Sequence, residues 1–349
     1  MATSIVGIDV GSSTVRAVEV ADPAKARPTL LRHFEVPLPD GAVSRGEILE
    51  PNTVAASLKR LWQQGGFKSK EVVLGMGNQR VLARDLTVPK MSRTRIREAL
   101  PFQVQDMLPV PVAEALLDFY PVSEGMSDNG PVVNGLLVAA VKEAVLGNVK
   151  ATQLAGLTTV DVDLIPFALS RVLISRPRIP GTVALIEIGA NTTSVVVVTD
   201  SVPQFVRIIP AGGAELTQAL REGLDVQLGE AERIKATIGL AKQVTTIEEQ
   251  QAVEIIYRVT SELLTSLRNT VSYFVNTRPN TPVSGLVVTG GGAQLPGLTD
   301  ALSEMTRLPV AVGDPFHAVA LSRSLNADVL RQNRSSLTVA LGLALGSAA

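Results

Sequence analysis

The sequence contains no cysteine and only two histidines, His33 and His317, among its 349 residues. Without cysteine the chain cannot form a disulfide, use a thiol nucleophile or build a cysteine zinc site. The two histidines lie far apart in sequence, which argues against a histidine-rich metal site and against a serine–histidine triad. The composition fits a reducing compartment.

The chain also has no excess of one charge sign, because its 32 Lys and Arg residues nearly balance its 33 Asp and Glu residues. The chain therefore lacks the basic surface on which nucleic-acid binding depends, and we expect no nucleic-acid partner. The longest apolar run, Leu337 to Leu345, has about half the length that spans a bilayer, so we expect a buried helix there. The N-terminus has no basic and apolar signal segment. These absences predict a cytoplasmic protein without a membrane span of its own.

The composition that is present, with 46% hydrophobic residues, is that of a globular protein. A chain of 349 residues is long enough to form two hydrophobic cores.

Residues 5–20 are the first distinctive segment. Two β-branched runs flank a turn of Gly11, Ser12 and Ser13, a pattern that predicts a β-hairpin. Small residues let backbone N–H groups approach a phosphate closely, and the preceding Asp9 can hold the hydrated Mg²⁺ that accompanies nucleotide phosphates. The alternative is an ordinary buried hairpin with a polar turn.

Residues 183–198 repeat this plan in the second half of the chain. Glu187 corresponds to Asp9 and Gly189 to Gly11, at an offset of 178 residues. A repeat of this length exceeds the roughly 20–50 residues of solenoid units. It predicts two similar domains, each of which presents a hairpin loop and an acid to a ligand between them.

Three glycines, Gly290 to Gly292, follow a predicted buried strand at residues 285–289. One glycine would satisfy a sharp turn, whereas three favour close approach of the backbone to a ligand at the strand end.

Glu232 and Lys235 are three residues apart in a predicted helix and so project from one face. They can simply pair with each other, or they can serve a ligand. Gly212 and Gly213 precede them, at the start of another predicted helix.

The order of these signals resembles that of the actin, heat-shock chaperone and sugar-kinase superfamily. In particular, the opening GIDVGSSTVRAVEV at residues 7–20 resembles that of the PilM family of type IV pilus assembly proteins. The resemblance implies an α/β, actin-like two-domain fold with duplicated ribonuclease-H-like halves and an inserted subdomain of the IC type, arranged as in FtsA. It divides the chain into IA (1–84, with 159–180 and 330–349), IC (85–158), IIA (181–212 and 280–329) and IIB (213–279).

The resemblance also implies ATP and Mg²⁺ as ligands. In related sites an acid and a lysine placed like Glu232 and Lys235 bind the ribose hydroxyls, and the triple glycine holds the adenosine. Asp9 and Glu187 would hold magnesium through water, and Glu187 is a candidate for positioning a water molecule. The implied nucleotide-binding residues are Gly11, Ser12, Ser13, Thr14, Arg16, Gly189, Ala190, Asn191, Thr192, Thr193, Gly212, Gly213, Glu232, Lys235, Gly290, Gly291, Gly292 and Gln294.

In PilM proteins the groove between IA and IC binds the short cytoplasmic N-terminal peptide of PilN, an inner-membrane pilus protein. The resemblance therefore implies a cytoplasmic adaptor, peripheral at the inner membrane through its partners, with room for other pilus components and for a homo-oligomer. In the insert we expect strands at 81–89, 116–122 and 136–141, an exposed hairpin loop at 123–130 and a helix at 142–155.

Two other functions stay open. An FtsA-like filament protein usually ends in an amphipathic membrane helix, whereas here only residues 346–349 follow the last predicted helix. A small-molecule kinase would need a catalytic acid or histidine over a substrate hydroxyl, and the insert offers no clear candidate.

Two residues depart from the PilM pattern: Arg16 replaces a lysine, and Glu187 replaces an aspartate. The extra methylene of Glu187 moves its carboxylate by about an ångström, and such a misplacement can cost about 100-fold in a positioned reaction. We therefore expect nucleotide binding with slow ATPase activity at most.

Overall fold

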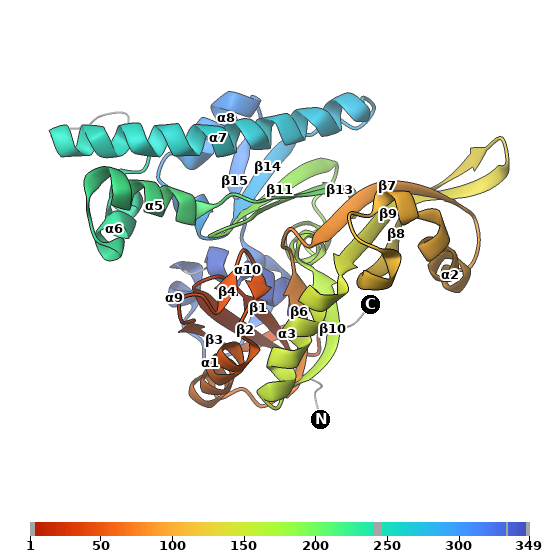
Figure 1. The fold of residues 1–349 in the computed structure, drawn as a ribbon, viewed down its shortest axis with the longest axis horizontal. Helices are drawn as coiled ribbons and strands as arrows, with labels where there is room; N and C mark the ends of the chain where they lie inside the picture. The colour runs from red at the N-terminus through yellow and green to blue at the C-terminus, as the bar shows by residue number, and fades with distance from the viewer. Residues whose placement is uncertain (1–3, 241–245, 333, 347–349) are drawn as a thin grey trace.

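Two sheets with the same core arrangement form the two halves of the chain (Figure 1). The computed structural model describes residues 4–240, 246–332 and 334–346. The first sheet contains, in spatial order, β10 (Thr158–Leu164), β6 (Glu71–Met76), β1 (Ser4–Val10), β2 (Thr14–Ala21), β3 (Thr29–Pro37) and β16 (Ala320–Leu321). The second contains β13 (Val202–Ile209), β12 (Thr193–Thr199), β11 (Thr182–Ile188), β14 (Gly285–Thr289) and β15 (Val310–Val312).

The predicted duplication is confirmed by the strand pairing. In the first sheet β1 pairs antiparallel with β2 and parallel with β6. In the second sheet β11 pairs antiparallel with β12 and parallel with β14. The third strands, β3 and β13, continue each meander antiparallel to β2 and β12. The two halves therefore share the expected α/β, actin-like plan.

Helices cover both sheets and connect them. The helices of the first half are α1 (Pro51–Gly65), α3 (Lys142–Leu154), α4 (Ile165–Ser170), α9 (Ala327–Gln332) and α10 (Arg334–Ala344). The helices of the second half are α5 (Gly213–Leu224), α6 (Leu228–Ile238), α7 (Ile247–Thr277) and α8 (Leu298–Thr306). The short strands β4 (Val43–Ser44) and β5 (Glu47–Ile48) form a separate hairpin. Among the described helices, none has both the length and the apolar character to cross a membrane.

Small residues allow close contact between the connecting elements. A Cβ atom on Gly7 of β1 would lie 2.0 Å from the carbonyl oxygen of Ala340 in α10. A Cβ atom on Gly342 of α10 would lie 2.3 Å from the carbonyl oxygen of Ala168 in α4. The predicted apolar run of α10 is buried between the sheets, as expected.

A third sheet has the order β7 (Val81–Pro89), β9 (Gly130–Val141), β8 (Ala115–Ser127), and we call residues 81–141 the β7–β9 subdomain. Helix α2 (Arg93–Gln103) packs on it, and two single turns, η1 (Gln105–Met107) and η2 (Val112–Glu114), follow. Its own core includes Leu100, Phe119 and Leu137. The hydroxyl of Ser92 accepts a hydrogen bond from the Arg95 N–H and so caps α2.

The strands of this subdomain are longer than the sequence suggested. We expected a loop at 123–130, but β8 and β9 stay paired as far as Ser127 and Gly130. The outer part of the hairpin projects from the molecule with both faces in solvent, so it lacks the alternation of apolar and polar residues that predicts strands (Figure 1).

Helix α3 packs on α1 and buries Ala151 in the core of the first half. The predicted domain bounds, with an insert over 85–158, remain a prediction. Helix α7 begins at Ile247, where Thr246 and Glu249 form a capping box.

Candidate functional site

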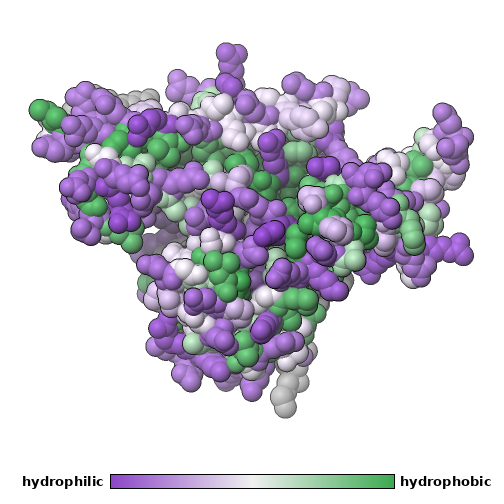
Figure 2. All heavy atoms as spheres, viewed as in Figure 1, coloured by the Kyte–Doolittle hydropathy of each residue, from purple (hydrophilic) through white to green (hydrophobic). Residues whose placement is uncertain are grey.

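A cavity of about 1100 Å³ lies between the two halves. On the left of Figure 2 the surface is hollowed between the body that carries α5 and α6 and the body below it. The cavity is of the size that holds a small-molecule ligand or cofactor. Of the predicted residues it is lined by Asp9, Gly11, Ser12, Ser13, Thr14, Arg16, Glu187, Gly189, Ala190, Asn191, Thr192, Gly212, Gly213, Glu232, Lys235, Gly290, Gly291, Gly292 and Gln294.

The two hairpin loops close in the same way. The Gly11 N–H donates to the Thr14 carbonyl at 2.9 Å, and the Gly189 N–H donates to the Thr192 carbonyl at 2.9 Å. Both loops meet the cavity, so the two halves present matching turns to one space. Thr193 does not line the cavity: it is fully buried, and its hydroxyl donates to the Ala211 carbonyl, so it supports the second loop from behind.

The first acid of the cavity is held beside a cation. An Nη atom of Arg16 lies 3.7 Å from Asp9 Oδ2, and its Nε donates to Glu35 at 2.8 Å. Burial raises the pKa of Asp9 above its ordinary value, and the nearby Arg16 opposes this only in part.

The second acid, Glu187, is more strongly perturbed. Burial and then the charge of Asp9 raise the pKa of Glu187 to about 8, against a weaker opposing effect of Arg16. Two carboxylates that share one site resist ionising together. At neutral pH Glu187 is therefore mostly a neutral acid unless a cation binds beside it.

The paired glycines bring the start of α5 against the second loop. The Gly213 N–H donates to the Gly189 carbonyl at 2.9 Å, and the Ala214 N–H donates to the Ala190 carbonyl at 2.8 Å. A Cβ atom on Gly212 would lie 2.6 Å from both of these carbonyl oxygens. Only glycine fits this contact, and the helix N-terminus beside it favours negative charge.

The pair Glu232 and Lys235 joins a third residue that the sequence analysis did not identify. Lys235 Nζ lies 2.7 Å from Glu232 Oε2 and 2.6 Å from the hydroxyl of Thr217. Thr217 in turn donates to Glu232 Oε1 at 2.7 Å. Thr217 stands four residues after Gly213 in α5, and this helical spacing was the one signal that could have revealed it.

The triple glycine forms the far wall of the cavity. Gly290 has a φ of +88°, and its added Cβ atom would lie 2.4 Å from the Ile188 carbonyl oxygen. A Cβ atom on Gly292 would lie 2.3 Å from the Ile188 side chain. Gly291, in contrast, has open space around it and exposes its backbone to the cavity. Three glycines are thus needed for two different reasons, close packing and access.

Asn148 of α3 also lines the cavity and was not predicted. It is buried, its Nδ2 lies 3.0 Å from the sulfur of Met76, and its Oδ1 has no hydrogen-bond partner among the described residues. A buried amide oxygen without a partner is costly, so a ligand or water in the cavity would satisfy it.

The residues fit a nucleotide with magnesium. The glycine turns leave room for phosphates, and Asp9 and Glu187 supply the oxygen ligands that Mg²⁺ prefers. Within the described ranges no three His, Asp or Glu gather as a ligand cluster. Because Mg²⁺ commonly takes one or two carboxylates and completes its shell with water and phosphate oxygens, two acids are sufficient.

These two halves with matching loops and one cleft define the class of actin-like two-domain proteins. The family model of the type IV pilus assembly protein PilM matches residues 7–348. The chain therefore belongs to the PilM family.

Solved structures and characterised relatives agree with this class. A PilM–PilN type IV pilus biogenesis complex has a TM-score of 0.87 and 28% identity, over 100% of both chains. MreB 5 of Spiroplasma citri bound to AMPPNP has a TM-score of 0.57 and 12% identity, over 97% of this chain and 94% of that one. The cell division protein FtsA of Bacillus subtilis (strain 168) is 23% identical to this chain in an alignment 354 residues long. The alignment covers 89% of this chain and 78% of FtsA.

Proposed function

We propose that this chain is a nucleotide-binding adaptor of type IV pilus assembly that holds Mg-ATP in its cleft and binds the N-terminal segment of a PilN-like membrane protein. The observation that carries the proposal is the glycine-lined cavity in a chain that matches the PilM–PilN complex over its whole length. This binding would keep the protein at the cytoplasmic face of the inner membrane through its partner.

Each part of the cavity has a role in this proposal. The two hairpin loops, around Gly11 and Gly189, would donate backbone N–H groups to phosphates. Arg16 would offer positive charge to the phosphates, and Asp9 with Glu187 would hold hydrated Mg²⁺. Glu232 and Lys235 would bind the ribose hydroxyls. When bound, Mg-ATP supplies a polyphosphate that contacts both halves at once.

Hydrolysis in this proposal is slow or absent. Glu187 stands where the family usually has an aspartate, and its extra methylene moves the carboxylate by about an ångström, a misplacement that can cost about 100-fold in a positioned reaction. The chain thus uses the nucleotide to set the opening of the cleft rather than to drive turnover.

Exposed apolar side chains support a partner site between the first half and the β7–β9 subdomain. Phe102 of α2 is 79% exposed and Leu116 of β8 is 42% exposed. Leu146 of α3 and Val160 of β10 are 52% and 46% exposed on the first half. In Figure 2 apolar surface gathers over the β7–β9 subdomain. Such residues are typical of a site that receives an apolar or amphipathic segment.

Calorimetric titrations test both parts of the proposal. Mg-ATP should bind the wild type, and a synthetic N-terminal peptide of a PilN-like protein should bind with an affinity that Phe102→Ser weakens at least tenfold. Ile247→Ser, at the start of α7, is the control that should leave peptide binding unchanged, because Ile247 is 74% exposed and does not line the large cavity. A protein that ignores the peptide and phosphorylates a small molecule would be a kinase, and one that sediments as filaments with ATP would be FtsA-like. Either result would refute the adaptor function.

A further inference from the structure

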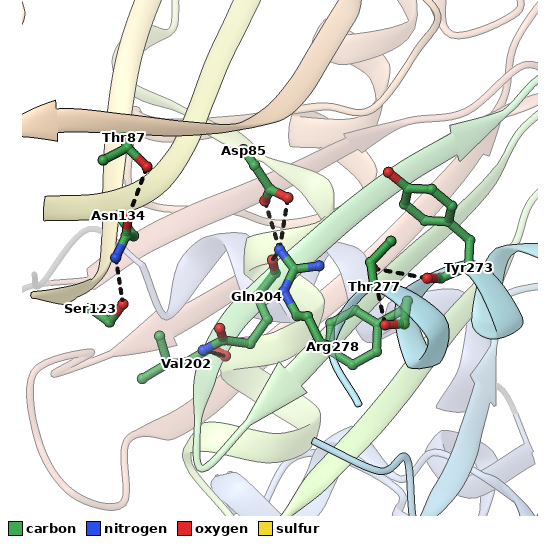
Figure 3. A network of polar contacts seen from close by, with 10 residues as sticks. Asp85, Thr87, Ser123, Asn134, Val202, Gln204, Tyr273, Thr277 and Arg278 are labelled. Atoms are coloured by element: carbon green, nitrogen blue, oxygen red, sulfur yellow. Dashed lines mark hydrogen bonds and ion pairs between the residues drawn. The ribbon is translucent and has the colours of Figure 1, made fainter. Parts of the chain in front are cut away.

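The C-terminal end of α7 is bound to the β7–β9 subdomain by one arginine (Figure 3). Arg278 directly follows α7, and its Nη2 donates to both carboxylate oxygens of Asp85 in β7, at 2.8 and 2.9 Å. The same nitrogen lies 3.3 Å from the Gln204 carbonyl oxygen of β13. The Arg278 guanidinium thus contacts both the inserted subdomain and β13 of the second half.

The two ends of this ion pair differ in rigidity. The guanidinium carbon of Arg278 lies 5.0 Å from the ring centre of Phe274, which is fully buried in the core of the second half. The side chain of Arg278 is 25% exposed, whereas that of Asp85 is 63% exposed. Arg278 is therefore preorganised on the second half, and Asp85 binds it from the solvent side. Exposed ion pairs of this kind are weak enough to open.

A pocket of about 250 Å³ lies beside the ion pair. It is lined by the polar residues Thr87, Ser123, Asn134 and Gln204 and by the apolar residues Leu86 and Val122. The Thr87 hydroxyl donates to Asn134 at 2.8 Å across β7 and β9, as Figure 3 shows. Beyond this pocket β13 contacts β7, β8 and β9, and Leu136 of β9 belongs to the same buried apolar cluster as Val206 of β13. The ion pair therefore adds to an apolar contact between the subdomain and the second half.

Helix α7 extends from this contact to the cleft. Its residues Thr260, Leu263 and Ser266 line the large cavity. From Ser266 to Arg278 the helix advances by about 18 Å at 1.5 Å per residue. One rigid element therefore contacts both the proposed nucleotide and the inserted subdomain.

We propose that the Asp85–Arg278 ion pair is a latch that makes the β7–β9 subdomain follow the second half when the cleft opens or closes. The subdomain is joined covalently to the first half, through residues 77–80 and at the junction of β9 with α3. A latched subdomain must therefore shift against the first half, and the partner site between them changes with the nucleotide state. This regulation rests on the proposed function.

Distances between spin labels test the latch directly. Because the chain has no cysteine, introduced cysteines are the sole labelling sites. Glu98→Cys on α2 is paired with Glu304→Cys on α8 in one protein and with Lys59→Cys on α1 in another; all three positions are exposed. Each pair is measured by pulsed electron resonance in the wild type and in Asp85→Asn, with and without Mg-ATP.

In the wild type we expect a narrow distribution of the distance between the labels at positions 98 and 304. In Asp85→Asn the width of this distribution should at least double. The control Asp118→Asn breaks an exposed ion pair with Arg97 inside the subdomain and should keep the narrow distribution. The double variant that exchanges the two charges, Asp85→Arg with Arg278→Asp, should restore the narrow distribution. Mg-ATP should change the Glu98–Lys59 distance in the wild type but not in Asp85→Asn.

The latch is refuted if, without ligand, the Glu98–Glu304 distance distribution is as narrow in Asp85→Asn as in Asp118→Asn. It is refuted as well if the distribution of the charge-swap variant stays as broad as that of Asp85→Asn. It is also refuted if bound Mg-ATP leaves the wild-type Glu98–Lys59 distance unchanged. Failure of the wild type to bind Mg-ATP in a separate titration would refute the proposed function instead. The ligand-free comparison of the two variants would then still decide whether the ion pair holds the subdomain.

Discussion

Arg16 lies 3.7 Å from Asp9 at the cleft while donating a hydrogen bond to Glu35 at 2.8 Å. The Arg16 guanidinium thus lies beside Asp9 of the proposed magnesium site and is held in place by Glu35, which lies outside that site. Arg16→Ala should weaken Mg-ATP binding by about tenfold or more, because a phosphate contact and the opposing charge beside Asp9 are both lost. Glu35→Gln keeps the cation and should change the affinity less than about threefold. Calorimetry that finds Arg16→Ala equal to wild type would contradict the assignment.

A negative charge at Gly291 should abolish nucleotide binding. An added Cβ atom there meets open space, so Gly291→Asp should fold normally while its side chain fills the space proposed for the adenosine and its charge repels the negatively charged nucleotide. Gly229→Asp is the matched control, because its Cβ atom also meets open space but the residue does not line the cavity. Fluorescent ATP titrations should show binding in the control and at least 100-fold weaker binding in Gly291→Asp. Comparable affinities would exclude the triple glycine from the site.

The cluster of Thr217, Glu232 and Lys235 should determine how well the protein distinguishes ATP from 2′-deoxy-ATP. A site that hydrogen-bonds a hydroxyl rejects the analogue that lacks it. We expect the wild type to prefer ATP by about tenfold, and Glu232→Ala to reduce this preference toward unity. Competition titrations with the two nucleotides provide the measurement. A preference that survives in Glu232→Ala would place the ribose elsewhere.

His33 should titrate below the ordinary histidine value of 6.5, because burial lowers its pKa and the charge of Glu35 opposes this only in part. Between the lowered pKa and 6.5 the unfolded chain binds more protons than the folded chain, so His33 makes stability rise with pH across this interval. The contribution is complete above pH 6.5 and is lost as the pH falls. With only two histidines in the chain, NMR titration can assign the signal through His33→Gln. A midpoint at or above 6.5 would contradict this prediction.

Gly7→Ala should destabilise the fold by about 2 kcal/mol or more, because its Cβ atom would meet the backbone of α10 at 2.0 Å. Gly147→Ala in α3 is the matched control. Its nearest neighbour would be 3.8 Å away, so the better helix propensity of alanine should stabilise the protein by about 0.5–1 kcal/mol. Urea unfolding of both variants checks the difference. Equal stabilities would show that α10 can move away from β1.

The sequence was sufficient to predict the duplicated hairpins and most of the residues that line the cavity. Gly11 and Gly189 could be identified because glycine at the end of an apolar strand has few structural explanations, and the same order occurs twice. The expected peptide site and the domain bounds stay predictions.

Other features have no local signature. Asn148 and Thr217 reach the cavity from helices whose position depends on tertiary packing. Asp85 and Arg278 are 193 residues apart and look like ordinary surface charges in the sequence. The outer part of the β8–β9 hairpin was predicted as a loop because its residues contact solvent on both faces.

The crossing of α4 and α10 has a mechanical consequence. Helix α10 packs on the first sheet, α4 contacts β12 of the second, and the two helices meet where Gly342 faces Ala168. A Cβ atom on Gly342 would lie 2.3 Å from the Ala168 carbonyl oxygen, so a larger residue there would force the two helices apart. Because these helices join the two halves, such a substitution should change the opening of the cleft and leave the ligand-contacting surfaces untouched.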